Sequence, residues 1–235
     1  MLYLKERARV CKRTENILNK KIHDQIIMKT SILCDFDGTI TTTDTCVHVL
    51  SHFADGDWRE YDDKLLGEEI ELEECMRLQF KMVKAERREI LRHLQEIVSI
   101  REGFKDFVDD CLRKKFSFTV ISAGLDFVIR HFLNIQGLSG VKVISGKTSI
   151  RDNGIEFEFP RKRFDDSVDF KVDFVRYQQS IGFKVVYIGD GLSDFQAVRE
   201  ADIVFVVKGS RLADMCRELN LSFVEFNSFK EIQIF

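Results

Sequence analysis

The chain contains 235 residues, with a hydrophobic content of 44% and a formal net charge of −3. This length accommodates one compact core with a small accessory domain, and the weak negative charge gives no reason to expect nucleic acid as a partner. No apolar run is long enough to span a membrane. The six cysteines are scattered without a CxxC pair, which favours reduced thiols in a cytoplasmic protein over disulfides or a zinc site.

Residues 1–27 differ in composition from the rest of the chain. They carry seven Lys or Arg residues against three acidic residues, and they lack the long apolar stretch of a secretory signal. Because Met28 stands directly before the first apolar run, we expect translation to begin there and residues 1–27 to be an upstream extension of the reading frame. The alternative is a basic helix that packs on the domain or touches an acidic partner.

Residues 31–41 contain an apolar run that ends in the sequence DFDGT, which begins at Asp35. Gly38 is typical of the turn that ends such a strand. Because side chains alternate along a strand, we expect Asp35 and Asp37 to leave its end on the same side. Carboxylates this close raise each other's pKa unless a cation lies between them, and carboxylate oxygens suit Mg²⁺. The segment predicts a magnesium site at the carboxyl end of a parallel sheet, although a solvated acidic turn has the same composition.

Residues 44–100 have the pattern of helices. Apolar residues at spacings of three and four mark three stretches, Val47–Phe53, Leu72–Met82 and Glu86–Ile97. Charged residues at the start of the last stretch indicate its solvent-facing side. We predict a helical insert over residues 44–100, between the two parts of a core formed by residues 28–43 and 101–235.

The rest of the chain alternates between strand and helix patterns. Helical spacing covers residues 103–113 and 126–133 and resumes at Lys171. Apolar strand-like runs cover residues 116–121, 141–145, 184–188 and 203–207. A hairpin is expected over 147–159, with its turn at Asp152-Asn153-Gly154. Such alternation predicts an α/β fold with a doubly wound parallel sheet.

Two further segments suggest groups that would bind a phosphate. Ser122 ends an apolar run and is followed by Ala123 and Gly124, so its hydroxyl and the N–H groups of the turn would form a phosphate cradle. A serine in an ordinary tight turn is the alternative. Lys171 begins a helix, where a fixed cation would balance the charge of a transferring phosphoryl group. A solvated lysine is the alternative there, and neighbouring basic residues would compete for the role.

The last polar segment is GDGLSD, which begins at Gly189 after the 184–188 strand. Its glycines permit a close backbone turn that presents Asp190 at the same sheet edge as Asp35. Asp190 is therefore predicted to be a further metal ligand. Asp194 would act on the metal directly or through water, or would simply be an acid favoured at the start of a helix.

In this order the four polar segments resemble the four motifs of the haloacid dehalogenase-like superfamily, most of whose members are phosphatases. The resemblance implies that Asp35 attacks phosphorus to form a phosphoaspartate. It implies that Asp37 protonates the leaving alkoxide and then takes a proton from the hydrolytic water. Asp37 favours phosphate esters as substrates, because a halide leaving group needs no acid.

The same resemblance implies the binding roles. Mg²⁺ would be held by the Asp35 carboxylate, the main-chain carbonyl of Asp37 and Asp190, with Gly189 and Asp194 supporting the site. The phosphate oxygens would be held by Thr39, Ser122, Ala123 and Lys171.

A helical cap between the first two motifs resembles the phosphoserine phosphatase branch of the superfamily. Within it, the segments at 100–104 and 122–127 look closest to the methionine-salvage phosphatases that act on 2-hydroxy-3-keto-5-methylthiopentenyl-1-phosphate. Arg101 is expected to meet an anionic group of the substrate, or else to form a surface ion pair with an acid such as Glu102. Phe80 and Met82 would line a pocket for the methylthio tail or belong to the core of the cap.

Other functions stay open at this point. Phosphoserine phosphatase is the main alternative, and a phosphomutase or a non-catalytic phosphate-binding module would use the same segments. The expected partner is a small phosphate ester, with no nucleic acid or membrane, and the chain would be a monomer or homodimer.

Overall fold

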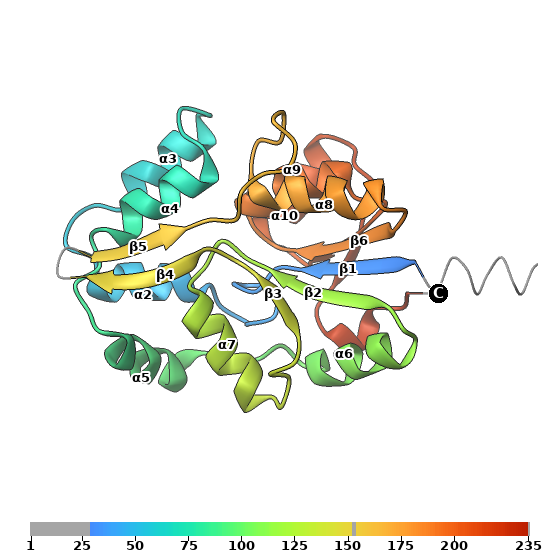
Figure 1. The fold of residues 1–235 in the computed structure, drawn as a ribbon, viewed down its shortest axis with the longest axis horizontal. Coiled ribbons are helices and arrows are strands. Elements are labelled where there is room, and N and C mark those ends of the chain that lie inside the picture. Colours follow the sequence, from blue (N-terminus) through green and yellow to red (C-terminus); the bar gives the residue numbers. More distant parts are fainter. Residues whose placement is uncertain (1–28, 152–153, 235) are drawn as a thin grey trace, which may run out of the picture.

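The computed structural model describes residues 29–151 and 154–234. Six strands form one sheet, in the order β3-β2-β1-β6-β7-β8, and all neighbouring strands are parallel (Figure 1). These strands are β1 (Thr30–Cys34), β2 (Ser117–Ile121), β3 (Lys142–Ile144), β6 (Lys184–Gly189), β7 (Ile203–Val207) and β8 (Val224–Phe226). The predicted α/β fold is confirmed. The strand β8 was not expected, because its sequence VEF is interrupted by Glu225 and forms no apolar run.

Helices cover both faces of this sheet. Figure 1 shows α6 (Phe104–Arg113) and α7 (Asp126–Ile135) on one side, and α8 (Phe170–Ser180) and α9 (Phe195–Glu200) on the other. The helix α10 (Arg211–Glu218) packs against β7 and α9. Since both faces are covered, β1 is buried at every residue, and the central strands read as continuous apolar runs rather than alternating ones.

Four helices lie between β1 and α6, in the segment predicted to be a cap, and are called the cap helices below. They are α2 (Thr45–Phe53), α3 (Arg59–Leu66), α4 (Leu72–Phe80) and α5 (Arg87–Ile97). Residues 59–66 were not expected to be helical, and α3 is a short helix without a buried residue. In α5 the expected solvent face is present, with Ile90 and Leu94 buried. The boundaries of the cap at 44 and 100 remain a prediction.

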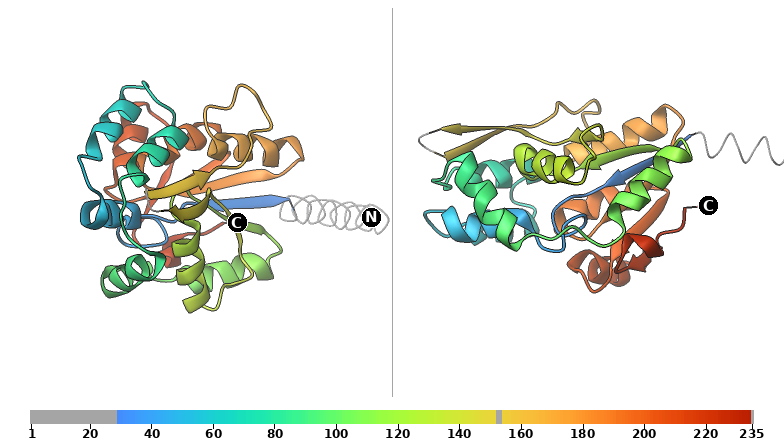
Figure 2. Two further views of the ribbon diagram at one scale, coloured as in Figure 1. Left: turned by 60° about the vertical axis from the view of Figure 1, so that its left-hand side comes forward. Right: turned by 90° about the horizontal axis from the view of Figure 1, so that it is seen from below.

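The predicted hairpin consists of β4 (Lys147–Arg151) and β5 (Gly154–Glu158), which pair antiparallel as a separate sheet. Figures 1 and 2 show it extending beside the cap helices. Its inner face packs on α4, where the rings of Phe80 and Phe157 lie 5.3 Å apart. Phe80 is fully buried in this contact, so it belongs to the packed interior of the cap. The hairpin therefore gives the cap a second support.

Some expectations fall outside the described residues. They are the proposed start at Met28, the nature of residues 1–27, and Asp152 and Asn153 of the predicted turn. Five described cysteines are free and buried: Cys34, Cys46, Cys75, Cys111 and Cys216. Over the described ranges, no helix has both the length and the apolar character needed to cross a bilayer.

Candidate active site

The loop after β1 occupies the middle of the sheet edge. The strand pairs with β2 on one side and β6 on the other, so the residues that follow Cys34 emerge between the ends of both neighbours. The Asp35 N–H donates to the carbonyl of Ile188 at 2.8 Å, which fixes the start of the loop. Gly38 turns the chain with φ +78°, and a Cβ at this position would collide with the carboxyl of Asp190. Glycine is required here by both the backbone and the neighbouring side chain.

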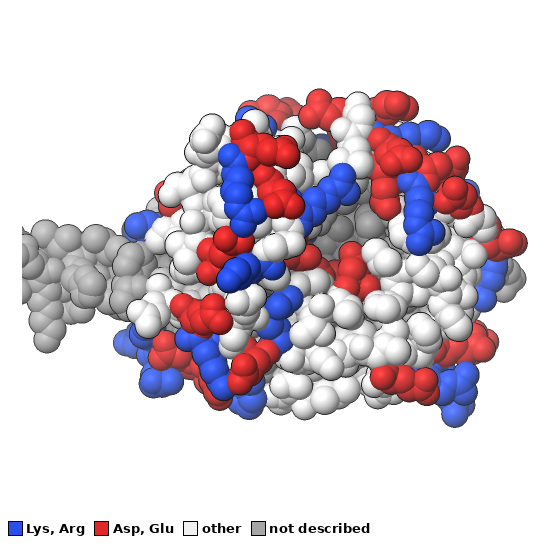
Figure 3. Space-filling model, turned by 180° about the vertical axis from the view of Figure 1, so that it is seen from behind, with Lys and Arg blue, Asp and Glu red and all other residues white. Residues whose placement is uncertain are grey.

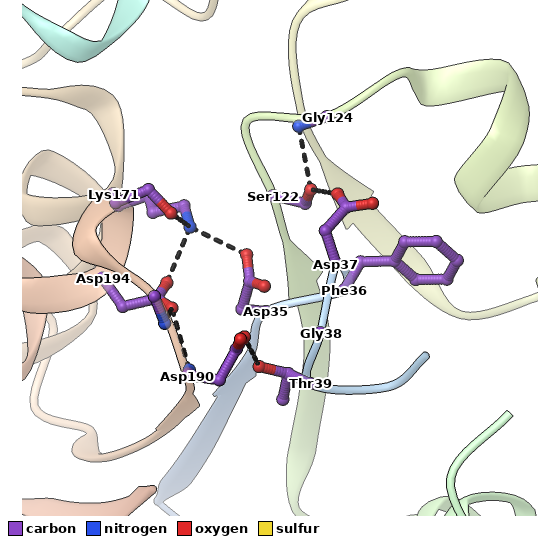
Figure 4. A network of polar contacts seen from close by, with 12 residues as sticks. Asp35, Phe36, Asp37, Gly38, Thr39, Ser122, Gly124, Lys171, Asp190 and Asp194 are labelled. Carbon is purple, nitrogen blue, oxygen red and sulfur yellow. Dashed lines mark hydrogen bonds and ion pairs between the residues drawn. The ribbon is translucent and has the colours of Figure 1, made fainter. Parts of the chain in front are cut away.

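Asp35 and Asp37 both line the cavity above this sheet edge, as expected, but their carboxylates contact different partners. The strand ends at Cys34, so its two-residue period does not decide which partners they contact. Figure 4 shows the Asp35 side chain directed toward Lys171, and the Asp37 side chain directed toward Ser122 at the end of β2. The two carboxylates therefore have different polar partners.

A buried ionic cluster surrounds Asp35. The Lys171 Nζ lies 2.8 Å from Asp35 Oδ1 and 2.7 Å from Asp194 Oδ1, and Lys171 is fully buried. Burial alone would lower the pKa of Lys171, but the carboxylates of Asp194 and Asp35 outweigh it and raise that pKa. Lys171 is therefore a fixed cation at the base of the site.

Asp194 holds the cluster in place. Its carboxylate also accepts hydrogen bonds from the Tyr187 hydroxyl at 2.8 Å and from the N–H groups of Asp190 and Gly191 at 3.1 Å. A Cβ on Gly189 would lie 2.7 Å from this carboxyl group, so the glycine gives it room. These contacts connect Lys171 to the loop that follows β6.

The carboxylates of Asp35 and Asp190 form the candidate metal site. Oxygens of Asp35, Asp190 and Asp194 lie within 4.8 Å of one another. The Thr39 hydroxyl donates to Asp190 Oδ1 at 2.6 Å, so in this arrangement Thr39 orients a carboxylate rather than standing free for a phosphate. Burial and the charge of Asp194 raise the pKa of Asp190 to about 7. Burial and Asp194 also raise the pKa of Asp35, against the opposing effect of Lys171.

These residues fit a hard divalent cation. The donors are carboxylate oxygens without sulfur or imidazole, which is the set that Mg²⁺ prefers. Within the described residues, Asp35 Oδ2 and Asp190 Oδ2 accept no hydrogen bond, whereas the oxygens of Asp194 are occupied by four donors. Asp35 and Asp190 are therefore the better ligand candidates, and the side chain of Asp37 is not part of this cluster.

Asp37 is held by hydroxyl groups from the core and from the cap. Its Oδ2 accepts from the Ser122 hydroxyl at 3.0 Å, and its Oδ1 accepts from the hydroxyl of Thr45, the first residue of α2. Ser122 in turn accepts from the Gly124 N–H at 2.9 Å. Burial raises the pKa of Asp37, and the bonds from Thr45 and Ser122 only partly oppose this. A raised pKa suits a group that must donate a proton near neutral pH.

Arg101 lies behind the loop rather than in the cavity. Its guanidinium donates to the carbonyl of Thr39 at 2.7 Å and to the carbonyl of Gly38 at 2.6 Å. It does not line the cavity above the aspartates, and Glu102 pairs with Lys230 instead. The expected contact with a substrate is therefore not supported, nor is a pair with Glu102. The donors of Arg101 are used to hold the turn at Gly38.

A cavity of about 360 Å³ opens above Asp35, Asp37 and Asp190, between the core and the cap. Ser122 and Ala123 line its floor as expected. Its cap wall is largely apolar and comes from α2, α3, α4 and the residue before α3: Val47, Leu50, Trp58, Leu65, Leu72 and Met76.

Figure 3 shows acidic and basic side chains intermixed on the face seen there. That face carries no extended positive surface of the kind that binds nucleic acid.

Several residues of the site were not anticipated from the sequence. Thr45 stands at a helix start, where a Thr after Asp44 looks like ordinary capping, and Tyr187 looks like one more core residue. Glu73, which is 7% exposed, accepts from the N–H of Phe170 at 3.0 Å and thus joins α4 to the start of the helix that carries Lys171. These contacts join residues far apart in sequence, so no local pattern signals them.

Comparison with known proteins identifies the family of this chain. The family described as haloacid dehalogenase-like hydrolase matches residues 32–199, so the chain belongs to that family of hydrolytic enzymes. The 2-hydroxy-3-keto-5-methylthiopentenyl-1-phosphate phosphatase of Bacillus pumilus is 29% identical over 211 residues, covering 87% of this chain and 90% of that protein. The protein of the same name from Lysinibacillus sphaericus is 30% identical over 212 residues, covering 87% and 92%.

Solved structures show the same fold. A phospho-aspartyl intermediate analogue of phosphoserine phosphatase superimposes with a TM-score of 0.64 at 16% identity, covering 87% of this chain and 97% of that one. Phosphoserine phosphatase from T. onnurineus superimposes with a TM-score of 0.60 at 20% identity, covering 88% and 93%. At these identities the likeness concerns the fold.

Proposed function

We propose that this protein is a Mg²⁺-dependent phosphatase that hydrolyses 2-hydroxy-3-keto-5-methylthiopentenyl-1-phosphate through a phosphoaspartate on Asp35. The observation that carries the proposal is the position of Asp35, between the fixed cation Lys171 and the carboxylate of Asp190, at the floor of a cavity with an apolar wall. The named relatives from two bacterial genera support the choice of substrate.

In the first step the Asp35 carboxylate attacks phosphorus, and the bond from phosphorus to the ester oxygen breaks. Asp37 delivers its proton to that oxygen, so the alcohol leaves uncharged. Lys171 lies 2.8 Å from Asp35 and balances its negative charge as the phosphate approaches. When bound by Asp35, the main-chain carbonyl of Asp37 and Asp190, Mg²⁺ supplies positive charge that screens the repulsion between carboxylate and phosphate.

In the second step a water molecule attacks the phosphoaspartate. Asp37, now ionised, takes a proton from this water, and the bond from phosphorus to the Asp35 oxygen breaks. Inorganic phosphate is released, and both aspartates return to their starting protonation states. Ser122 and Thr45 keep the Asp37 carboxyl in one orientation through both proton transfers.

The cap wall favours the methylthio substrate over phosphoserine. Leu50, Trp58 and Met76 offer apolar surface to a methylthio tail, and burial of such a tail contributes about 0.8 kcal/mol per methylene-sized group. Phosphoserine has no apolar part to use this wall. It remains the second candidate, because Asp62 and Arg211 also line the cavity and would match an ammonium and a carboxylate.

A panel of phosphate esters tests the proposal by comparing kcat/KM. The kcat/KM for the methylthio enol phosphate should exceed that for phosphoserine by about 100-fold or more, because the pocket matches the first substrate and leaves polar groups of the second unpaired. Phosphate release should stop on chelation with EDTA and return with Mg²⁺. A higher kcat/KM for phosphoserine would replace the proposed substrate, and no release from any monoester would overturn the phosphatase proposal itself.

A further inference from the structure

The cavity has an uneven distribution of charge. Five aspartates line it, namely Asp35, Asp37, Asp44, Asp62 and Asp190, and Arg211 is its one cationic lining residue within ranges 29–151 and 154–234. Lys171 lies beneath the floor and is fully buried against two carboxylates. Arg211 is therefore the cation that remains available to a part of the substrate other than the phosphate.

The backbone of Arg211 is tied to the metal-site loop. Arg211 is the first residue of α10, whose N-cap Ser210 accepts from the Ala213 N–H at 3.3 Å. The next residue, Leu212, donates its N–H to the carbonyl of Asp190 at 3.0 Å. Leu212 and Ala213 are fully buried, so the start of α10 is anchored in the core. These contacts fix the backbone of Arg211 relative to the loop that carries Asp190.

The guanidinium of Arg211 is free to bind. Among the described residues it makes no hydrogen bond and no ion pair within 4.0 Å, and its side chain is exposed. The guanidinium of Arg101, in contrast, donates to main-chain carbonyls. Arg217, on the same helix as Arg211, pairs with Asp214 and Glu225. An exposed, unpaired arginine at a cavity is suited to an oxygen of a ligand.

Asp62 lines the same cavity from the cap. Its Oδ1 accepts from Gln79 Nε2 at 2.8 Å, and Gln79 also donates to the Trp58 carbonyl at 3.2 Å, so the carboxylate is held in one orientation. Burial raises the pKa of Asp62, while the hydrogen bond from Gln79 and the positive charge of Arg211 lower it. Asp62 and Arg211 both line the cavity and form no ion pair with each other among the described residues.

We propose that Arg211 and Asp62 determine substrate specificity by binding an acceptor and a donor on the two carbons that follow the phosphate-bearing carbon. The proposal rests on the proposed function. In the methylthio enol phosphate, Arg211 donates to the 3-keto oxygen and Asp62 accepts from the 2-hydroxyl, while the apolar cap wall contacts the methylthio tail. Both residues bind substrate away from the reacting phosphorus. One stands on the core and the other on the cap, so a bound substrate joins the two parts.

The test compares Arg211→Gln, Asp62→Asn and the control Arg217→Gln on three probes: the methylthio enol phosphate, phosphoserine and phenyl phosphate, which lacks both polar groups. Loss of a charged hydrogen bond should lower kcat/KM for the enol phosphate by about 10- to 100-fold in each site variant. Most of that loss should appear in KM. The kcat/KM for phenyl phosphate should change less than about threefold in the site variants. The control Arg217→Gln should have the kcat/KM values of the parent enzyme on all three probes.

Equal losses on the enol phosphate and phenyl phosphate would overturn the proposal, because Arg211 would then serve the phosphate or the fold. No loss on any probe would overturn it as well. If phosphoserine is the better substrate and its kcat/KM alone depends on Arg211 and Asp62, the specificity role is supported and the substrate named above is replaced. Circular dichroism of each variant identifies a fall in kcat/KM that comes from misfolding.

Discussion

Asp35 and Asp37 are two residues apart, yet their carboxylates contact different groups. Asp35 contacts the ammonium of Lys171 at 2.8 Å, whereas Asp37 accepts hydrogen bonds from two neutral hydroxyls, those of Thr45 and Ser122. An adjacent cation favours the ionised carboxylate more strongly than a hydroxyl does. Burial raises the pKa of both carboxyls, so the difference between them lies in the groups that they contact, a fixed cation beside the nucleophile and two hydroxyls beside the acid. The different contacts of the two side chains therefore match their different proposed roles, nucleophile for Asp35 and proton donor for Asp37.

The strongest test of the Asp35 side is Asp35→Asn. The amide keeps the shape of the carboxylate but is neutral and a poor nucleophile, so turnover should fall by on the order of 10⁴-fold or more. Phosphate release under Mg²⁺ saturation measures the loss. Burst kinetics of the parent enzyme with a labelled substrate should show a phosphoenzyme that the variant lacks.

Asp35→Glu is the companion variant, because it retains the charge and moves the carboxylate by one methylene. Mg²⁺ should still stabilise the folded Asp35→Glu variant, but the variant should lose turnover. Near-parent activity in Asp35→Asn would rule out the covalent scheme.

The Asp37 side is tested by Asp37→Asn on substrates with different leaving groups. A proton donor matters most when the leaving oxygen is a strong base, so hydrolysis of an alkyl phosphate should fall by about 10²- to 10⁴-fold. Formation of the phosphoenzyme from p-nitrophenyl phosphate should fall far less, because its leaving group needs no proton. Rapid-quench measurement of phosphoenzyme formation separates this step from hydrolysis, which also requires Asp37. An equal loss of phosphoenzyme formation with both leaving groups would show that Asp37 has no role as an acid.

The sequence predicted the parts of this site that follow from strand ends. Asp35, Ser122 and Asp190 follow β1, β2 and β6, which are neighbours in the parallel sheet, so their proximity follows from the fold. The partners of the Asp37 carboxylate did not follow, because they depend on a turn beyond the end of the strand. The pairing of Lys171 with Asp194 depends on how α8 docks against the loop after β6, and a sequence pattern does not encode that angle.

The roles of the two arginines near the site could not be predicted from the sequence either. Arg101 and Arg211 are both basic residues near the site in the fold, and nothing in their sequence neighbours separates a structural role from a binding role. The difference arises from what surrounds each guanidinium: main-chain carbonyls around Arg101, and the open cavity beside Arg211. The helices α2 and α5 were anticipated to within two residues at each end, since amphipathic spacing marks both of them.

Thr45→Val sharpens the comparison on the Asp37 side. The variant keeps the volume of the threonine and removes one of the two hydroxyls that hold Asp37, so kcat should fall by about 3- to 10-fold. Because the Thr45 hydrogen bond lowers the pKa of Asp37, its loss should raise that pKa. The alkaline limb of the kcat–pH profile, where the acid loses its proton, should then move to higher pH.

Thr42→Val is the matched control, since Thr42 is exposed and its hydroxyl bonds to the Ser99 carbonyl outside the site. It should leave both kcat and the pH profile unchanged. An unshifted alkaline limb in Thr45→Val would mean that Thr45 contributes only to the fold of the cap.

The smallest expected effect concerns stability, and it tests whether the Asp35 side is a metal site. The pKa of Asp190 is raised to about 7 in the folded protein, against an ordinary value near 4 in the unfolded chain. Between these two values the folded state binds more protons than the unfolded state, so the metal-free protein should lose stability as the pH rises from about 4 to 7. Mg²⁺ binds the ionised carboxylates, so its stabilising effect should grow over the same range.

Thermal unfolding in EDTA and in Mg²⁺ at pH 5 and pH 8 measures both trends. At about 100 times its Kd, Mg²⁺ should raise Tm by about 5–10 °C at pH 8 and by much less at pH 5. Asp190→Asn should flatten the pH dependence in EDTA and remove the response to Mg²⁺, whereas the exposed control Asp109→Asn should keep both. If Asp190→Asn kept the full response to Mg²⁺, the ion would be held elsewhere, and the contrast between Asp35 and Asp37 would have to rest on Lys171 alone.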